Sequence, residues 1–190
     1  MSLEELADNT RTDKNTTHSY LPLYQQLLES KKEMAKNVLE IGIQTGGSIK
    51  LWDDFFTNAT VYGIDIIDYN TVWNGIKNND NIVLYTSTNA YDTNFVHNTF
   101  LKSNIKFDML LDDGPHSLGS MIQFIQLYSQ LMTENGILII EDVQSMDWIH
   151  SLSLVVPEHL KPYINVYDLR DVKNRYDDIV FTIDKSKKIE

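Results

Sequence analysis

Five residues that can carry metal or acid–base chemistry stand directly after two apolar segments of the sequence. Asp112, Asp113 and His116 follow residues 107–111, and Glu141 and Asp142 follow residues 137–140. If the two segments are parallel strands of one sheet, their carboxyl ends open on the same crevice, so these side chains should converge. Four close carboxylates repel one another unless a cation or a proton lies among them, and carboxylate oxygens suit Mg²⁺, Mn²⁺ or Ca²⁺. The pattern predicts a divalent-cation site with a histidine base beside it.

A simpler interpretation is that acids at strand ends are solvated or cap the helices that follow. For any one of these residues taken alone, that is the better explanation. Capping accounts for one acid per strand, however, and here each strand ends in two acids in succession. The two pairs together therefore favour a site.

Alternating strand and helix patterns would position these residues. Short apolar, β-branched segments are typical of buried parallel strands at residues 38–41, 61–65, 82–85, 107–111 and 137–140. Helical spacing occurs at residues 20–28, 47–56, 93–100 and 117–132, with Ser117 as an N-cap. Residues 163–168 and 178–183 indicate two more strands around a polar turn at 171–176. We predict one α/β domain over residues 1–190, with a seven-stranded, mainly parallel sheet, one antiparallel strand and helices on both faces. Residues 1–36 form an N-terminal cap segment and helix.

Composition limits the class of protein and of partner. With 190 residues, 42% of them hydrophobic, the chain can bury one substantial core. A net charge of −11 argues against the phosphate-neutralising surface of a nucleic-acid binder. No apolar run approaches the length of a membrane span, the first residues lack the order of a signal peptide, and there is no cysteine. We expect a soluble cytoplasmic protein with a small-molecule or carbohydrate partner, and neither nucleic acid nor membrane.

A glycine-containing turn after the first predicted strand indicates the class of cofactor. Gly42 stands where the backbone must turn, and Gly46 and Gly47 stand where a helix begins with free amides. A dinucleotide-binding turn needs a second glycine at the position of Gln44, whose side chain disfavours a pyrophosphate. Asp65, about 20 residues further on, is placed to accept both hydroxyls of an adenosine ribose. We expect a nucleoside cofactor without phosphates.

These features resemble the class I S-adenosylmethionine-dependent methyltransferases, which have a Rossmann-like fold. The segment Glu40-x-Gly42-x-x-x-Gly46-Gly47 is similar to the first motif of that family. Asp65 matches its ribose-binding acid, and residues 86–89 stand where the adenine-contacting loop falls. The resemblance implies that S-adenosylmethionine is the cofactor and that the chain is a methyltransferase.

A narrower resemblance adds the metal and the acceptor. Thr12-Asp-Lys-x-x-x-His18-x-Tyr20, Asp112-Asp-Gly-x-His116 and Glu141-Asp142 are similar to the metal-dependent sugar O-methyltransferases of macrolide biosynthesis, of the mycinamicin and tylosin type, and to their cephalosporin-hydroxylase-type relatives. The resemblance implies Asp113, Glu141 and Asp142 as Mg²⁺ ligands, and His116 with Asp113 as the catalytic residues. It implies these cofactor-binding residues: Lys14, His18, Tyr20, Glu40, Gly42, Gly46, Gly47, Ser48, Asp65, Ile66, Ser87, Thr88 and Asp112.

The predicted function is therefore transfer of a methyl group from S-adenosylmethionine to a hydroxyl of a sugar or glycan, including a nucleotide-activated deoxysugar, with Mg²⁺, Mn²⁺ or Ca²⁺ as the metal. One alternative is a catechol or phenol O-methyltransferase, and another is an inactive S-adenosylmethionine-binding module. A homodimer is the assembly to test. Lys14 and His18 either close over the methionine carboxylate or belong to a segment that only caps the next helix. Tryptophans are more often core or half-buried side chains than ligand platforms, and Trp148, soon after the Glu141-Asp142 pair, is the one candidate among them to line an acceptor pocket.

Overall fold

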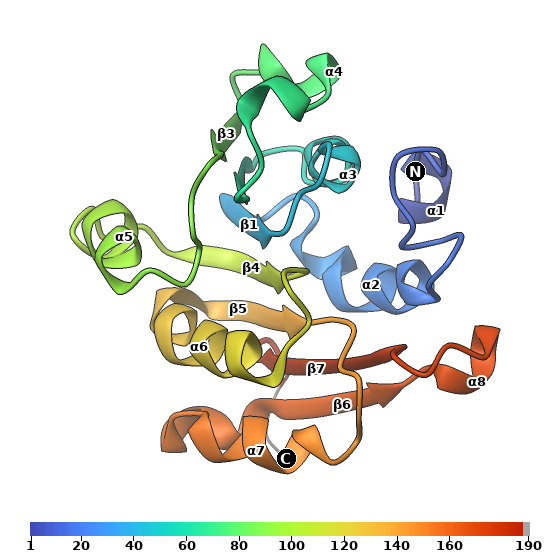
Figure 1. The fold of residues 1–190 in the computed structure, drawn as a ribbon, viewed down its shortest axis with the longest axis vertical. Coiled ribbons are helices and arrows are strands. Elements are labelled where there is room, and N and C mark those ends of the chain that lie inside the picture. The colour runs from blue at the N-terminus through green and yellow to red at the C-terminus, as the bar shows by residue number, and fades with distance from the viewer. Residues whose placement is uncertain (188–190) are drawn as a thin grey trace.

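Seven strands form one sheet in the computed structural model, which describes residues 1–187 (Figure 1). Their order across the sheet is β3-β2-β1-β4-β5-β7-β6. Strand β7 runs antiparallel to both of its neighbours, and all the other pairs are parallel. This confirms the predicted sheet, and residues 188–190 of the predicted domain lie outside the described part. The strands are β1 (Asn37–Ile41), β2 (Thr60–Ile64), β3 (Ile82–Tyr85), β4 (Phe107–Asp112), β5 (Met132–Ile140), β6 (Ile164–Asp168) and β7 (Ile179–Asp184).

Helices cover both faces of the sheet, because the central strands are apolar on both sides (Figure 1). Alternate residues of one strand serve opposite faces: Leu111 packs in the core under α2 and α3, while Leu110 packs in the core under α6. The helices are α1 (Leu3–Leu6), α2 (Tyr20–Leu28), α3 (Gly47–Phe55), α4 (Asn74–Lys77), α5 (Thr93–Val96), α6 (Leu118–Tyr128), α7 (Trp148–Val155) and α8 (Arg170–Lys173). Shorter turns are η1 (Glu29–Lys31), η2 (Tyr69–Thr71), η4 (Ser129–Leu131) and η5 (Glu158–Tyr163), and η3 (His97–Leu101) is a π-helical segment.

Local sequence explains where these helices begin and end. Ser117 caps α6, since its side chain accepts a hydrogen bond from the amide of Ser120, as the sequence predicts. Asp92 caps α5 in the same way through Asn94 and Phe95. The predicted helix over residues 93–100 is divided, because α5 ends after one turn and continues into the π-helical segment η3.

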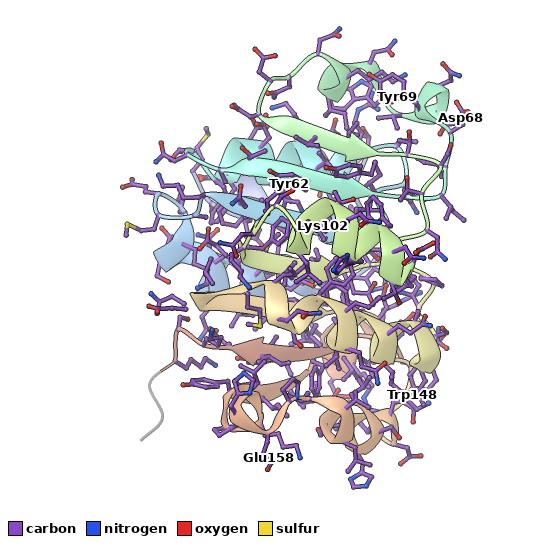
Figure 2. All side chains as sticks on the ribbon, turned by 90° about the vertical axis from the view of Figure 1, so that its left-hand side faces the viewer. Tyr62, Asp68, Tyr69, Lys102, Trp148 and Glu158 are labelled. Carbon is purple, nitrogen blue, oxygen red and sulfur yellow. The ribbon has the colours of Figure 1, made fainter. Side chains whose placement is uncertain are left out.

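One edge of the sheet collects the loops that carry the predicted site. The carboxyl ends of the parallel strands lie there, and the first residues of β7 lie there too because β7 runs in the opposite direction. Along this edge the loops follow the strand order, from β3 at one end to β7 and β6 at the other. Figure 2 shows the extent of the molecule across the strands: Asp68 and Tyr69 lie at the β3 end, and Trp148 lies at the β6 end.

Within residues 1–187, none of the helices combines the length and the apolar character needed to cross a lipid bilayer.

Candidate active site

A cavity of about 570 Å³ opens along the edge where the loops collect. Its walls extend from the segment after β3, past the loops after β2, β1, β4 and β5, to the segment before β7. Lining residues from the predicted cofactor set are Lys14, His18, Gly42, Ser48, Asp65, Ile66 and Thr88, and those from the predicted catalytic and metal set are Asp113, His116 and Asp142. The other predicted residues lie behind these walls or beside them: Tyr20, Glu40, Gly46, Gly47, Ser87, Asp112 and Glu141.

Gly42 lets two loops of the cavity meet. Its φ is +83°, and a Cβ built on it would lie 1.9 Å from the backbone oxygen of Asp113. The amide of Asp113 in turn donates to the carbonyl of Ile41 at 2.9 Å. Gly46 precedes α3 with a φ of +99°. Glycine at position 42 is therefore required for the turn after β1 to lie against the acids after β4.

Asp65 holds the same turn from the other side. Its Oδ2 accepts from the amides of Ile43 (2.8 Å) and Gln44 (3.0 Å), and its Oδ1 accepts from the amide of Ile67 (3.2 Å). The backbone of Asp65 also accepts from the amide of Thr88. Asp65 thus links the loops after β1, β2 and β3 at one end of the cavity, beside the exposed side chain of Ile66.

The ammonium group of Lys14 lies among three carboxylates. Its Nζ is 2.5 Å from Glu141 Oε1, 2.7 Å from Asp113 Oδ2 and 3.3 Å from Glu40 Oε1, and only 1% of the side chain is exposed. Burial by itself lowers the pKa of Lys14, but the three carboxylates outweigh it and hold the pKa well above the usual value. Lys14 is therefore a buried cation inside the acidic cluster.

Glu141 has both carboxylate oxygens engaged within the protein. Oε1 pairs with Lys14, and Oε2 accepts from the hydroxyl of Tyr24 at 2.5 Å. Burial raises the pKa of Glu141, yet Lys14 and these hydrogen bonds lower it overall. Among residues 1–187, Glu141 belongs to neither of the two clusters of side chains whose possible metal-ligand atoms lie within 4.8 Å of one another. Its predicted role as a metal ligand therefore stays a prediction.

Asp113 and Asp142 each keep one oxygen directed at His116. Oδ2 of Asp113 accepts a hydrogen bond from Lys14, and its Oδ1 lies 3.8 Å from Nε2 of His116. Asp142 accepts from the Tyr20 hydroxyl at Oδ1, and its Oδ2 lies 3.5 Å from the same Nε2. One ligand atom from each of the three residues lies within 4.8 Å of the others. The structure therefore brings together three of the predicted catalytic and metal residues.

The backbone at this point is strained. His116 has a φ of +53° and Asp142 a φ of +55°, both in the left-handed region that non-glycine residues rarely adopt. Burial raises the pKa of Asp142, and the negative charge of Glu141 adds to that shift. Strained residues persist where the surrounding structure determines them, and they gather at functional sites.

Asp112 turns away from the acidic cluster. It is 3% exposed, its Oδ1 accepts from the Tyr91 hydroxyl at 2.5 Å, and it does not line the cavity. Burial raises the pKa of Asp112 to about 7, although the hydrogen bonds from Tyr91 and the Gly114 amide oppose the shift. The neighbouring Tyr91 lines the cavity instead.

The segment before β7 reaches the site, which sequence patterns did not predict. Asp178 accepts at Oδ2 from the amide of Ser19, and its Oδ1 lies 2.6 Å from Nδ1 of His18. That Nδ1 is 3.3 Å from Oδ1 of Asp142. Asp177 and Arg175 line the cavity from the same segment. One signal for them existed in the sequence: two acids at positions 177 and 178 directly precede an apolar strand.

Two predicted placements differ from the structure in detail. Lys14 lines the cavity, but its ammonium group is bound to carboxylates. Trp148 packs with the core under α6 and does not line the cavity.

The sequence of the chain is similar to those of known O-methyltransferases. No family model matches the chain. It is 25% identical to L-olivosyl-oleandolide 3-O-methyltransferase of Streptomyces antibioticus, over 77% of this chain and 38% of that protein. It is 27% identical to mycinamicin VI 2''-O-methyltransferase of Micromonospora griseorubida, over 77% of this chain and 37% of that protein. The chain spans less than two fifths of the length of these curated relatives.

Solved structures resemble nearly all of the chain. The mycinamycin-pathway methyltransferase MycE, in complex with Mg and SAH, superposes with a TM-score of 0.75 at 20% identity, over 97% of this chain and 54% of that one. An O-methyltransferase from Bacillus cereus in complex with SAH gives a TM-score of 0.65 at 15% identity, over 96% of this chain and 90% of that one. These likenesses establish the fold and confirm the predicted Rossmann-like architecture of class I methyltransferases.

Proposed function

We propose that this chain, which has the class I methyltransferase fold, is a divalent-metal-dependent O-methyltransferase that acts on a hydroxyl group of a sugar. One observation carries the proposal. Asp113 and Asp142 each have one oxygen bound inside the protein and the other directed at His116, and all three residues line the cavity that Gly42 and Asp65 also line. One cavity thus contains both the residues proposed for the cofactor and the residues proposed for acid–base chemistry.

The cofactor end suits an adenosine. The loops after β1, β2 and β3 meet around Asp65, and Ile66 and Thr88 line the same wall. S-adenosylmethionine bound here would supply the electrophilic methyl group. Asp65, Gly42 and Lys14, which line the cavity on this side, are the residues that would hold the cofactor.

The donor set at the other end fits a divalent cation. Asp113 and Asp142 each offer a carboxylate oxygen, a hard ligand, within 4.8 Å of the other, and hard ligands suit Mg²⁺ better than an imidazole does. We therefore assign the two carboxylates to the cation, with the predicted third ligand Glu141 behind them, and keep His116 for the proton. A cation held there would stabilise negative charge on a hydroxyl oxygen.

His116 removes the proton of the acceptor hydroxyl at Nε2, the ring nitrogen that faces both carboxylates. An alcohol with a pKa near that of water, about 15.7, and a histidine of about 6.5 differ by roughly 9 units, or about 12 kcal/mol. Because His116 alone cannot hold an alkoxide at equilibrium, the base and the cation have to act together.

The named relatives support the sugar as acceptor. Both curated relatives described above are O-methyltransferases by name, one of them acts by name on L-olivosyl-oleandolide, and the MycE structure contains Mg and SAH. A small glycosylated acceptor also agrees with the net charge of −11, which disfavours nucleic acid. The homodimer stays a prediction.

Calorimetric titration with S-adenosylhomocysteine tests the cofactor assignment without knowledge of the acceptor. We expect saturable one-to-one binding that Asp65→Ala weakens and that Asp171→Asn, a change on the exposed part of α8, leaves unchanged. Absence of binding to the wild type would remove the proposal.

A transfer assay tests the acceptor and the metal. Radiolabelled S-adenosylmethionine is offered with methyl α-L-rhamnopyranoside, other methyl deoxyglycosides or catechol, with Mg²⁺ or with EDTA. We expect transfer to a glycoside that requires Mg²⁺. His116→Ala should lower kcat more than it changes cofactor affinity, and a rate independent of pH between about 6 and 9 would argue against His116 as the base. Transfer to catechol alone would replace the sugar by a phenol.

A further inference from the structure

Arg175 and Asp177 form an ion pair in the wall of the cavity, on the segment before β7. Nη2 of Arg175 donates to Oδ2 of Asp177 at 3.1 Å, and both residues line the cavity. The proposed chemistry uses neither of them. Each residue has one polar atom that makes no hydrogen bond: within residues 1–187, Nε of Arg175 and Oδ1 of Asp177 are buried and have no hydrogen-bond partner. Buried polar atoms are normally paired, so an unpaired donor beside an unpaired acceptor calls for an explanation.

The position of the pair along the sheet edge indicates which ligand would explain it. The edge runs from the loop after β3, with Thr88, past Asp65 after β2 and Gly42 after β1, to the acids after β4 and β5. Strand β7 comes next, so Arg175 and Asp177 lie beyond Asp142, at the opposite end from the adenosine wall. A cofactor held by the residues around Asp65 and Gly42 would occupy the other part of the cavity. What reaches Arg175 and Asp177 is the acceptor.

The contacts of Asp142 connect the pair to the reacting centre. Oδ2 of Asp142 faces His116, while Oδ1 is 3.3 Å from Nδ1 of His18. His18 and Asp177 belong to one group of side chains whose polar atoms lie within 4.8 Å of one another. Contacts through His18 and Asp142 thus connect the Arg175–Asp177 pair to the proposed base.

The charge of the pair selects the kind of group it binds. An isolated guanidinium would favour a carboxylate or a phosphate, but Asp177 neutralises Arg175, and Asp142 and Asp178 add negative charge nearby. A second anion is therefore disfavoured. A hydroxyl group both donates and accepts, so it can donate to Oδ1 of Asp177 and accept from Nε of Arg175, once the partly exposed Arg175 side chain shifts to admit it.

We infer that Arg175 and Asp177 form the acceptor subsite, which binds one or two hydroxyl groups of an uncharged sugar ring next to the hydroxyl that is methylated. The inference rests on the proposed function and goes further in two ways: it names binding residues on the segment before β7, and it favours a neutral glycoside over a nucleotide-activated sugar. Both residues are binding residues in this assignment, because they touch the acceptor away from the transferred methyl group.

Steady-state kinetics on the intact protein test the subsite. Initial rates are measured with methyl α-L-rhamnopyranoside at saturating S-adenosylmethionine and Mg²⁺, for the wild type, Arg175→Gln and Asp177→Asn. Each change removes a charge-assisted hydrogen bond that substrate and transition state share, so KM should rise by about tenfold to a hundredfold while kcat stays within about threefold. Saturation-transfer NMR of the rhamnoside on the protein loaded with S-adenosylhomocysteine should lose intensity in both variants.

A matched control lies five residues away. Arg170 pairs with Asp168 on the exposed surface, and Arg170→Gln should leave KM unchanged. Calorimetry with S-adenosylhomocysteine should give wild-type affinity for all three variants, which shows that a raised KM does not come from unfolding.

Three outcomes would overturn the inference, and they can be told apart. Unchanged KM in both variants, with transfer by the wild type intact, refutes the subsite alone. Tighter binding of a nucleotide sugar than of the neutral glycoside, lost in Arg175→Gln, refutes the neutral acceptor. A wild type that binds S-adenosylhomocysteine but methylates no glycoside refutes the proposed function, and the subsite with it.

Discussion

Replacing Lys14 by Met tests the assignment of this residue as the buried counter-charge of the acidic cluster. Lys14 is 1% exposed and lies within 3.3 Å of Glu40, Asp113 and Glu141. Methionine keeps much of the side-chain volume and removes the charge, so three buried carboxylates lose their shared cation. Breaking one buried ion pair by removing a partner costs about 3–5 kcal/mol.

The loss of unfolding free energy in Lys14→Met should depend on pH in a defined direction. The folded-state pKa of Lys14 is raised, so its stabilisation is fully present below the unfolded pKa of about 10.4 and is lost only as pH rises through the higher folded value. The wild type therefore keeps this contribution between pH 5 and 8. In the variant, the carboxylates can escape their repulsion by taking up protons, which is easier at pH 5. We expect a loss of about 3–5 kcal/mol at pH 8 and a smaller loss at pH 5.

Urea unfolding followed by circular dichroism, with EDTA present, measures this loss. The control is Lys102→Met, a change at an exposed lysine near the end of η3 (Figure 2), which should stay within about 0.5 kcal/mol of the wild type. If the loss for Lys14→Met at pH 8 were below about 1 kcal/mol, or larger at pH 5 than at pH 8, the role of Lys14 as counter-charge would be refuted.

Three further predictions concern residues around the cavity. Gly42→Ala puts a Cβ against backbone at a positive φ, so S-adenosylhomocysteine affinity should fall at least about tenfold by calorimetry, whereas Gly119→Ala, with nothing within 4 Å, should not change it. The folded-state pKa of Asp112 is raised from 3.8 to about 7, so its stabilisation is full below pH 3.8 and is lost as pH rises through 7. Asp112→Asn should therefore flatten the fall in unfolding free energy between pH 5 and 8, and a slope equal to that of the wild type would contradict this. In calorimetry, Asp142→Asn should weaken Mg²⁺ binding by at least about tenfold, and Glu141→Gln should weaken it by less. The reason is that Asp142 keeps an oxygen directed at His116, whereas both oxygens of Glu141 are bound by Lys14 and Tyr24. The opposite order would mean that Glu141 is the stronger ligand.

Much of the fold followed from periodicity alone. The predicted strands match β1 to β7 closely, because continuous apolar segments can be buried only between two layers of helices. The N-cap at Ser117 was equally local. Strand β5 is longer than predicted: it begins at Met132, five residues before the predicted strand, since the polar residues 133–135 carry no strand pattern.

The site was predictable where a parallel strand delivers its residues. Asp113 and Asp142 follow adjacent strands in register, so their convergence with His116 depends only on strand order. Lys14 was different, because nothing in a polar N-terminal segment tells which carboxylates a lysine reaches. Asp177 and Arg175 were missed since the antiparallel direction of β7 brings the beginning of a strand, and not its end, to the cavity.

The sequence by itself determined the element types, the glycine at the turn after β1 and the presence of paired acids at two strand ends, because these depend on neighbours in the chain. Only the tertiary structure decided how the charges are shared: Glu141 turns to Lys14 and Tyr24, while Asp113 and Asp142 keep an oxygen directed at His116. The two pairings of Glu141 join residues more than a hundred positions apart, and which partner a buried charge takes depends on the packing that excludes water around it.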